Sequence, residues 1–241
     1  MIITILTIFP QMLESLEQYP LIRRLIQKKE LTLNITDLRE YAAGSFRHID
    51  DSPYGGGPGM ILRPEPVFSA LDQYRSPTST VILFTPAGIP LNQAKVRELS
   101  QKEQLILICG HYEGIDERIA EAADELISVG DYILSGGESA AAILVDAVTR
   151  LQEVVIRAES TEEESFESGL LEYPQYTHPR VFRGKEVPEV LLSGNHDKIR
   201  QWRLKESLRK TLRFRPDLLA QKELTAEETA LLEEIRNEDQ E

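Results

Sequence analysis

Three short segments contain glycine where side chains would otherwise cover the backbone. They are "FTPAG" (84–88), "CGHYEG" (109–114) and "LSGGE" (134–138), and each comes at the end of an apolar run. Glycine leaves the amide and carbonyl groups of the main chain open, so that they can hydrogen-bond the edge of a flat heterocycle. The three segments therefore predict a small-molecule site that is built largely from backbone.

A fourth glycine-rich segment, "PYGGGPGM" (53–60), fits neither a helix nor a central strand. No Gly-Lys-Ser/Thr follows it, so it is not a Walker loop, and Met60 stands where a dinucleotide motif has its third glycine. Its composition alone favours a flexible turn over a ligand loop. Small residues also follow Gly137, and for Ala140–Ala142 we favour close packing of a helix over ligand contact.

Other reactive side chains form no recognisable catalytic or metal pattern. The four histidines are scattered, and the single cysteine, Cys109, lies in an apolar run that predicts a buried, inert thiol. Arg150 is typical of a surface arginine at a helix C-terminus. The carboxylates of "STEEESFESG" (160–169) are typical of a solvated acidic linker.

Apolar runs and helical patterns alternate over the first 155 or so residues. This alternation predicts an α/β fold with a largely parallel sheet and helices on both of its faces. In such sheets ligands bind beyond the carboxyl ends of the strands, where the three glycine segments lie. The expected strands are 1–9, 79–86, 104–110 and 124–134, with Tyr132–Leu134 as a short strand in its own right; the expected helices are 12–29, 92–103, 116–123 and 138–151.

The C-terminal third differs in charge from the rest of the chain. The 241 residues carry a net charge of −13, yet 178–215 has eleven Lys or Arg against four Asp or Glu. We expect a helix over 195–214, a short last helix over 225–237, and contact between the basic segment and nucleic-acid phosphates. There is no signal pattern, no apolar run near the roughly 20 residues of a membrane span, and we expect a cytoplasmic protein.

Five blocks of the sequence together resemble one known family. "YGGGPGM", "CGHYEGIDERI", "SVGDYILSGGE", "LLEYPQYTHP" and "VPEVLLSGNHDKIRQWR" are similar, in order and spacing, to the TrmD family of bacterial tRNA (guanine-N1)-methyltransferases. The resemblance covers Met1 to about residue 219. It implies a SPOUT fold with a deep trefoil knot, a topology that the pattern of elements would not predict. The implied domains are a cofactor-binding domain (1–157), a flexible acidic linker (158–172) and a small helical tRNA-binding domain (173–241).

The resemblance further implies that S-adenosylmethionine binds in the knot. The implied cofactor-binding residues are Pro86, Gly110, Tyr112, Glu113, Gly114, Ser128, Val129, Gly130, Tyr132, Leu134, Gly136, Gly137 and Glu172. The sequence has Ala140 where family members often have proline, which we expect to loosen one wall of the pocket slightly.

The implied reaction is methyl transfer to N1 of the guanine 3′ of the tRNA anticodon, position 37. Arg150 matches the family's arginine at guanine O6, and Glu164 stands where the family has an aspartate base, so that Glu163 or Glu162 could substitute for it. The resemblance implies a homodimer with its active site at the subunit interface, and use of magnesium, although no metal ligands are recognisable. The alternatives are a SPOUT enzyme acting on another RNA and a non-catalytic RNA-binding homologue.

Overall fold

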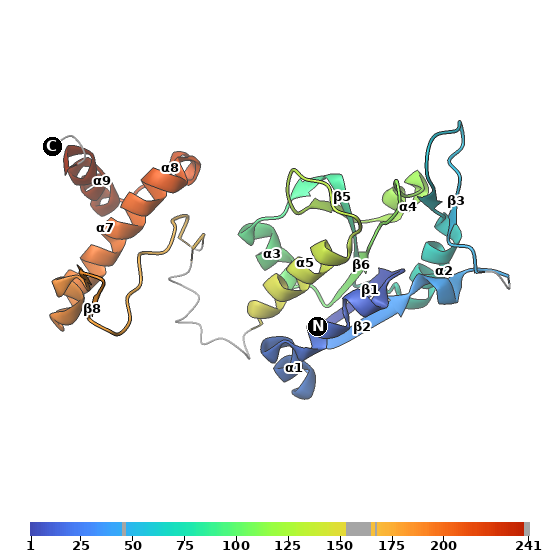
Figure 1. Cartoon of the computed structure of the whole chain (residues 1–241), viewed down its shortest axis with the longest axis horizontal. Coiled ribbons are helices and arrows are strands. Elements are labelled where there is room, and N and C mark those ends of the chain that lie inside the picture. Colours follow the sequence, from blue (N-terminus) through green and yellow to red (C-terminus); the bar gives the residue numbers. More distant parts are fainter. Residues whose placement is uncertain (45–46, 153–164, 167, 239–241) are drawn as a thin grey trace. The chain divides into compact units, whose positions relative to one another are not determined.

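The computed structural model describes residues 1–44, 47–152, 165–166 and 168–238. The chain divides into two compact units, Met1–Ile156 and Arg157–Glu241 (Figure 1). None of the helices in the described ranges is both long enough and apolar enough to cross a membrane.

A five-stranded sheet forms the centre of the first unit, with the strand order β2-β1-β6-β5-β7. Every neighbouring pair in it is parallel, which confirms the expected α/β architecture. β2 was not expected from the sequence. The bounds are β1 Ile2–Thr7, β2 Thr32–Asp37, β5 Ser79–Pro90, β6 Gln104–Ile108 and β7 Glu125–Ser128.

Helices cover both faces of this sheet because successive strand residues point to opposite sides. In β6, Leu105 and Leu107 belong to a core with α1, α3 and α5, whereas Ile106 and Ile108 belong to a core with α2 and α4. All four side chains are fully buried, which explains the uninterrupted apolar run. The helices are α1 Pro20–Gln27, α2 Pro64–Tyr74, α3 Gln93–Ser100, α4 Glu117–Ala122 and α5 Glu138–Arg150.

The expected helix over 12–29 is wrong in its first half. Two short 3-10 turns, η1 (Pro10–Met12) and η2 (Glu14–Gln18), precede α1, which begins at Pro20. Tyr19 is extended, with ψ 126°. Proline disfavours the helical conformation in the residue before it, so that the apolar periodicity spans a break in the backbone.

The expected strand at Tyr132–Leu134 is also wrong. β7 ends at Ser128, and Tyr132, Ile133 and Leu134 lie in an exposed loop. Apolar character here reflects the lining of a cavity, described below, and not a place in the sheet. The expected loop "FTPAG" lies within β5, but Phe84 and Ile89 both pair with Ile127, so residues 85–88 bulge out of the ladder.

Two antiparallel strands, β3 (Asp50–Asp51) and β4 (Ile61–Leu62), carry the glycine-rich segment 53–60 between them. η3 (Leu38–Tyr41) precedes them in the chain. Tyr54 in this segment is fully exposed. A turn, the interpretation that composition favours, fits this position, and its flexibility stays a prediction.

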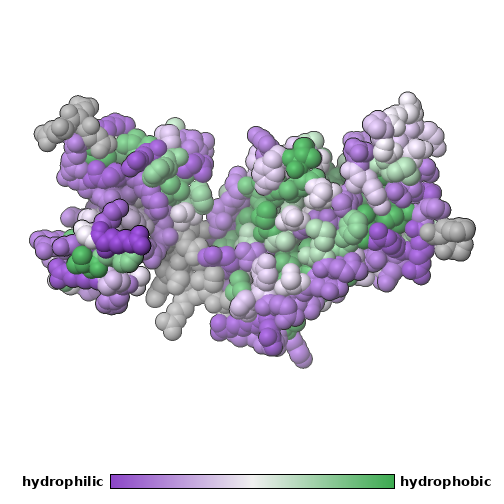
Figure 2. All heavy atoms as spheres, in the orientation of Figure 1, coloured by the Kyte–Doolittle hydropathy of each residue, from purple (hydrophilic) through white to green (hydrophobic). Residues whose placement is uncertain are grey.

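The second unit is helical, with a small core of Leu170, Leu208, Leu232 and Ile235. α7 (His196–Phe214) and α9 (Ala226–Glu238) confirm the two expected helices, and α8 (Pro216–Gln221) lies between them in the chain. A β-hairpin of β8 (Val181–Phe182) and β9 (Lys185–Glu186) and the turn η4 (Glu189–Leu192) precede α7. The visible surface of this unit is mostly hydrophilic, whereas the first unit shows apolar surface over α5 and the loop before it (Figure 2).

Candidate functional site

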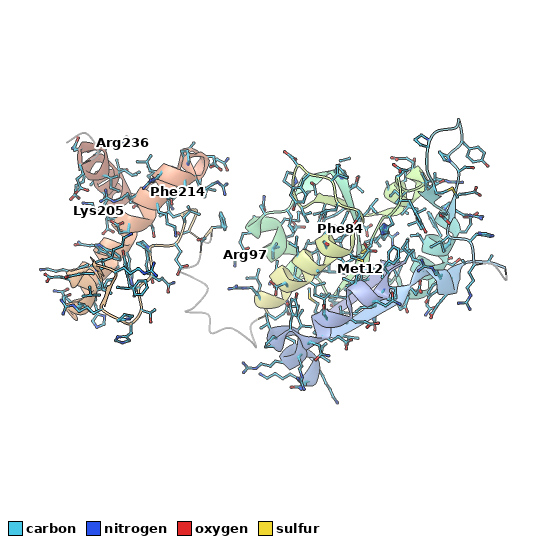
Figure 3. The ribbon with its side chains drawn as sticks, in the orientation of Figure 1. Met12, Phe84, Arg97, Lys205, Phe214 and Arg236 are labelled. Atoms are coloured by element: carbon cyan, nitrogen blue, oxygen red, sulfur yellow. The ribbon has the colours of Figure 1, made fainter. Side chains whose placement is uncertain are left out.

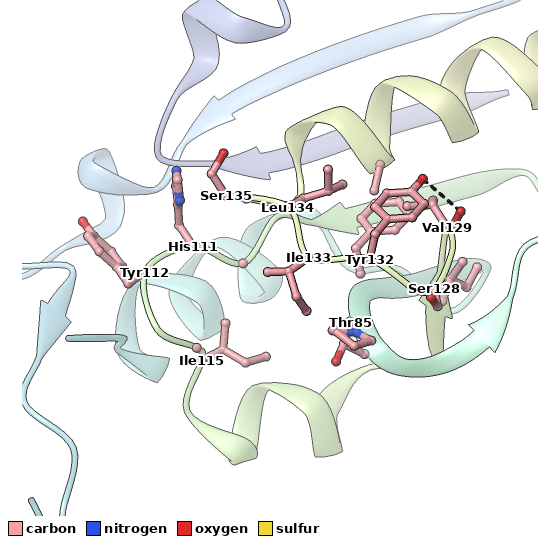
Figure 4. A pocket seen from close by; sticks show the side chains of 18 of the residues that line it. Thr85, His111, Tyr112, Ile115, Ser128, Val129, Tyr132, Ile133, Leu134 and Ser135 are labelled. Atoms are coloured by element: carbon pink, nitrogen blue, oxygen red, sulfur yellow. Dashed lines mark hydrogen bonds between the residues drawn. The ribbon is translucent and has the colours of Figure 1, made fainter. Parts of the chain in front are cut away.

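A cavity of about 270 Å³ opens where the loops after β6 and β7 meet the bulge of β5 (Figure 4). It lies at the carboxyl ends of parallel strands, where ligand sites of such sheets are found. Twelve of the thirteen residues that the resemblance assigns to the cofactor line it; the exception is Glu172. The cavity is also lined by residues that the resemblance does not assign to the cofactor, among them Phe84, Thr85, Ile115, Ile127, Ile133 and Ser135.

The bulge in β5 depends on a glycine that passes very close to β7. A Cβ on Gly88 would lie 2.4 Å from the backbone nitrogen of Ile127. Real Cβ atoms do not approach a backbone so closely, so only glycine allows this crossing. The crossing places Thr85 and Pro86 at the wall of the cavity.

Gly137 is a second position where two backbone segments pass very close to each other. This contact explains why small residues precede α5. The Gly137 amide donates a hydrogen bond to the Gly110 carbonyl at 2.9 Å, and a Cβ there would lie 2.7 Å from the Cα of Cys109. The start of α5 is therefore packed directly on the end of β6. Both backbones at this contact, at Gly110 and at Gly137, line the cavity.

The loop between β7 and α5 is held by hydrogen bonds of Tyr132. Its amide donates to the Gly130 carbonyl at 2.9 Å and its hydroxyl donates to the Val129 carbonyl at 3.2 Å. Ile133 is 84% exposed and lies at the cavity between Ile115 and Thr85 in Figure 4. An exposed isoleucine at a cavity wall gives a flat ring an apolar surface to bury.

The loop after β6 is fastened to β4. The amide of Leu62 donates to the Gly114 carbonyl at 3.0 Å, and the amide of Glu113 donates to the Met60 carbonyl at 3.1 Å. Tyr112 has a positive φ of 65°. The pKa of its phenol is raised, mainly by burial and to a smaller extent by the negative charge of the nearby Asp50. None of residues 53–60 lines the cavity, so the glycine-rich segment is connected to this site indirectly, through the hydrogen bond between the Met60 carbonyl and the Glu113 amide.

A buried carboxylate, Glu138, supports the cavity from behind and was missed in the sequence. It is 1% exposed, and its Oε1 accepts a hydrogen bond from the Thr7 hydroxyl at 2.7 Å. The same hydroxyl accepts from the Phe9 amide at 2.9 Å. Glu138 thus ties the start of α5 to the end of β1. A carboxylate in the first turn of a helix is favoured by the helix dipole, and its place at the start of the expected helix is the signal in the sequence that could have drawn attention to it.

His111 lines the cavity and packs the edge of its ring against Phe9, with 4.6 Å between ring centroids. Across the described ranges, no group of three His, Cys, Asp or Glu residues is arranged to hold a metal ion. The use of magnesium stays a prediction.

The remaining predicted residues are not among those that line this cavity, or they fall outside the described residues. Arg150 is exposed in the last turn of α5, about 15 Å along the helix from Ala140 at the cavity wall. Glu172 belongs to the second unit, where its carbonyl accepts from Lys210 Nζ at 3.0 Å. Glu162, Glu163 and Glu164 lie outside the described residues.

We expect Cys109 to be inert toward thiol reagents in the folded protein. The side chain is completely buried, and burial, with a smaller contribution from the Glu138 carboxylate, raises the pKa of its thiol well above the usual value. A disulfide reagent at pH 8 should label it only after denaturation. Native labelling as fast as labelling in guanidinium would contradict this assignment.

The chain is similar to a single protein family over most of its length. The family model for "tRNA (Guanine-1)-methyltransferase TrmD" matches residues 1–221. Proteins named tRNA (guanine-N(1)-)-methyltransferase from Streptococcus sanguinis, Thermosipho africanus and Dictyoglomus turgidum are 52%, 49% and 48% identical to it. These alignments cover 98%, 97% and 98% of this chain and 98%, 96% and 97% of the relatives.

Proposed function

This chain belongs to the tRNA (guanine-1)-methyltransferase family, and we propose that it transfers a methyl group from S-adenosylmethionine to N1 of the guanine at tRNA position 37, immediately 3′ of the anticodon. The observation that carries the proposal is about 50% identity to proteins of that name over nearly the whole chain. A tRNA substrate also makes the cytoplasm the proposed location.

The groups that line the cavity of the first unit are of the types that could bind the methyl donor. The cavity offers backbone groups at Gly110, Gly130 and Gly136 for the edge of an adenine, and the apolar side chains of Ile133 and Leu134 for its faces. S-adenosylmethionine supplies a methyl group that is already activated on a sulfonium. The protein therefore has to bind and orient the donor, keep water out, and handle charge and a proton on the guanine.

Two side chains are proposed to act on the guanine. N1 carries a proton at neutral pH, so a carboxylate that accepts it makes N1 a better nucleophile. We assign this role to Glu164, in the place of the family's aspartate. Arg150 is proposed to donate hydrogen bonds to guanine O6, where negative charge increases as the proton leaves.

The position of Arg150 supports a dimer. Arg150 lies at the end of α5 opposite to the one that lines the cavity, which is consistent with an arginine that is supplied by a second chain. We propose a homodimer in which Arg150 of the partner subunit and Glu164 of the partner subunit complete each cavity. We also propose a trefoil knot in the first unit, a topology consistent with the crossing of Gly88 over Ile127 and the packing of Gly137 on Cys109.

Arg150→Ala is expected to lower kcat for methyl transfer by about a hundredfold, the size of effect seen when one donor to a developing oxyanion is removed. The dissociation constant of S-adenosylmethionine should change less than threefold, because no bond to the donor is removed. Calorimetry and single-turnover assays measure the two quantities. Arg24→Ala, in the last turn of α1, is the matched control, and a loss of donor binding without a loss of turnover would make Arg150 structural.

The function itself is tested with purified protein, labelled donor and tRNA transcripts that contain or lack guanine at position 37. We expect 1-methylguanine at that position only. Methylation of another RNA in its place would favour a different SPOUT activity, and donor binding without transfer to any tRNA would indicate a non-catalytic homologue.

A further inference from the structure

Three cations of α7, namely Arg200, Lys205 and Arg209, are paired with carboxylates of α9. Lys205, labelled in Figure 3, belongs to α7. Its Nζ lies 2.6 Å from a Glu234 oxygen and 2.7 Å from a Glu238 oxygen, and Arg209 Nη2 lies 2.8 Å from Glu238. Arg200 is paired with Glu227 at 2.8 Å. Phosphates would have to compete with these carboxylates, so we expect these three cations to contribute less to RNA binding than cations without an ion-pair partner.

The β8–β9 hairpin carries cations that, unlike the three of α7, have no ion-pair partner among the described residues. Arg180, Arg183 and Lys185 are exposed, and none of them forms an ion pair with any described residue. The hairpin also contains the exposed Glu186 in β9, so three cations against one carboxylate leave a net charge of 3 − 1 = +2 to attract an RNA backbone. The hairpin lies at the end of the second unit where α7 begins (Figure 1).

The turn of the hairpin is short and well defined. Arg183 and Gly184 have φ values of 49° and 76°, the positive pair that a tight two-residue hairpin turn requires. Phe182 and Lys185 are cross-strand partners, and the amide of Val187 closes the base of the hairpin on the Arg180 carbonyl at 3.0 Å. Cross-strand partners share a face, so Phe182 and Lys185 project together.

An aromatic side chain at the centre of these cations is left open to solvent. Phe182 is 62% exposed, and the Arg183 guanidinium lies 5.3 Å from the centre of its ring. Neither Phe182 nor Val181 belongs to the core of the unit. An open ring flanked by positive charge is the combination with which proteins stack unpaired bases and hold the adjoining phosphates.

We propose that the β8–β9 hairpin is an RNA-contact element, in which Phe182 stacks on an unpaired base while Arg180, Arg183 and Lys185 bind neighbouring phosphates. The inference rests on the proposed tRNA substrate, and it specifies which surface of the second unit meets single-stranded nucleotides. A protein partner for this hairpin would need an acidic apolar surface, and it is one of the outcomes that the experiment separates.

Phe182→Ala is expected to weaken tRNA binding by between about fivefold and about a hundredfold, the loss that one stacked base produces. Phe182→Trp should restore binding, because any large aromatic surface stacks. Filter binding of labelled tRNA in the full-length protein measures the affinity without turnover, and calorimetry with S-adenosylmethionine should give the same dissociation constant for all variants.

Phe214→Ala is the matched control. Phe214 is 61% exposed at the other end of α7, and Arg213 lies 5.1 Å from its ring. Phe214 differs from Phe182 in having no cross-strand lysine beside it, and the cation that follows it, Arg215, is paired with Asp217 at 2.6 Å. The Phe214→Ala variant should therefore bind tRNA as the wild type does. An equal loss in both alanine variants, or unchanged binding of Phe182→Ala, overturns the proposal, and the latter would leave a protein partner as the reason for the open ring.

The double substitution Arg183→Gln with Lys185→Gln keeps the aromatic ring and removes two charges. It should reduce the slope of log affinity against log salt by about one to two, and an unchanged slope would also overturn the proposal. Methyl transfer by the wild type is measured in parallel. If the wild type methylates tRNA but the hairpin variants bind tRNA as tightly as the wild type, only the RNA-contact proposal is wrong. If the wild type does not methylate any tRNA, the proposed function is wrong, and the affinities of the hairpin variants for tRNA still decide whether the hairpin contacts RNA.

Discussion

Glu164→Gln is expected to lower kcat for methyl transfer by between about a hundredfold and about ten thousandfold at neutral pH, the usual contribution of a positioned general base. Glutamine keeps the size and the hydrogen-bonding reach of glutamate but cannot accept the N1 proton. Binding of S-adenosylmethionine and of tRNA should stay close to wild type. Single-turnover assays with saturating protein measure the step directly.

The neighbouring carboxylates provide the controls for this substitution. Glu162→Gln and Glu163→Gln alter the same acidic segment and should leave turnover nearly unchanged. The deficit of Glu164→Gln should narrow as the pH rises, because hydroxide increasingly removes the guanine proton without the enzyme. Undiminished turnover at pH 7 would exclude Glu164 as the base, and a large loss in Glu163→Gln would move the role to that residue.

Gly137→Ala is expected to separate the start of α5 from the end of β6. The added carbon would lie 2.7 Å from the Cα of Cys109 and 3.2 Å from the Gly110 nitrogen, and neither backbone atom can rotate away. Overpacking of this kind costs about 1–3 kcal/mol of folding stability. Because Gly110 and Gly137 line the cavity, we expect affinity for S-adenosylmethionine to fall by at least about tenfold.

Gly114→Ala is the matched control for stability. Gly114 lines the same cavity, has no positive φ, and has no other atom within 4 Å of an added Cβ. The melting temperature of the Gly114→Ala variant should equal that of the wild type or exceed it slightly, since alanine restricts the conformations of the unfolded chain more than glycine does. If Gly137→Ala melts and binds the donor like the wild type, the close packing of α5 on β6 does not hold the site together.

The amino-acid pattern alone was enough to predict the elements that bury continuous or periodic apolar faces. β6, α5, α7 and α9 were expected close to where they lie, because burial on one or both sides leaves a local signature. The same reasoning failed where apolar residues have another purpose. Tyr132–Leu134 read as a strand, yet these residues line a cavity, and periodicity does not distinguish a wall of a pocket from a buried strand.

Only the tertiary structure decided which distant segments touch. The glycine segments at 84–88, 109–114 and 134–138 were visible in the sequence, but the distances of Gly88 from Ile127 and of Gly137 from Cys109 were not. The pairing of three α7 cations with α9 carboxylates was likewise not visible in the sequence, and it leaves the β8–β9 hairpin among the places in the described part of the chain where positive charge has no counter-ion. Local patterns record how much of each residue is buried, whereas contacts between segments depend on how complete elements pack, and charge is available only where packing leaves it without a counter-ion.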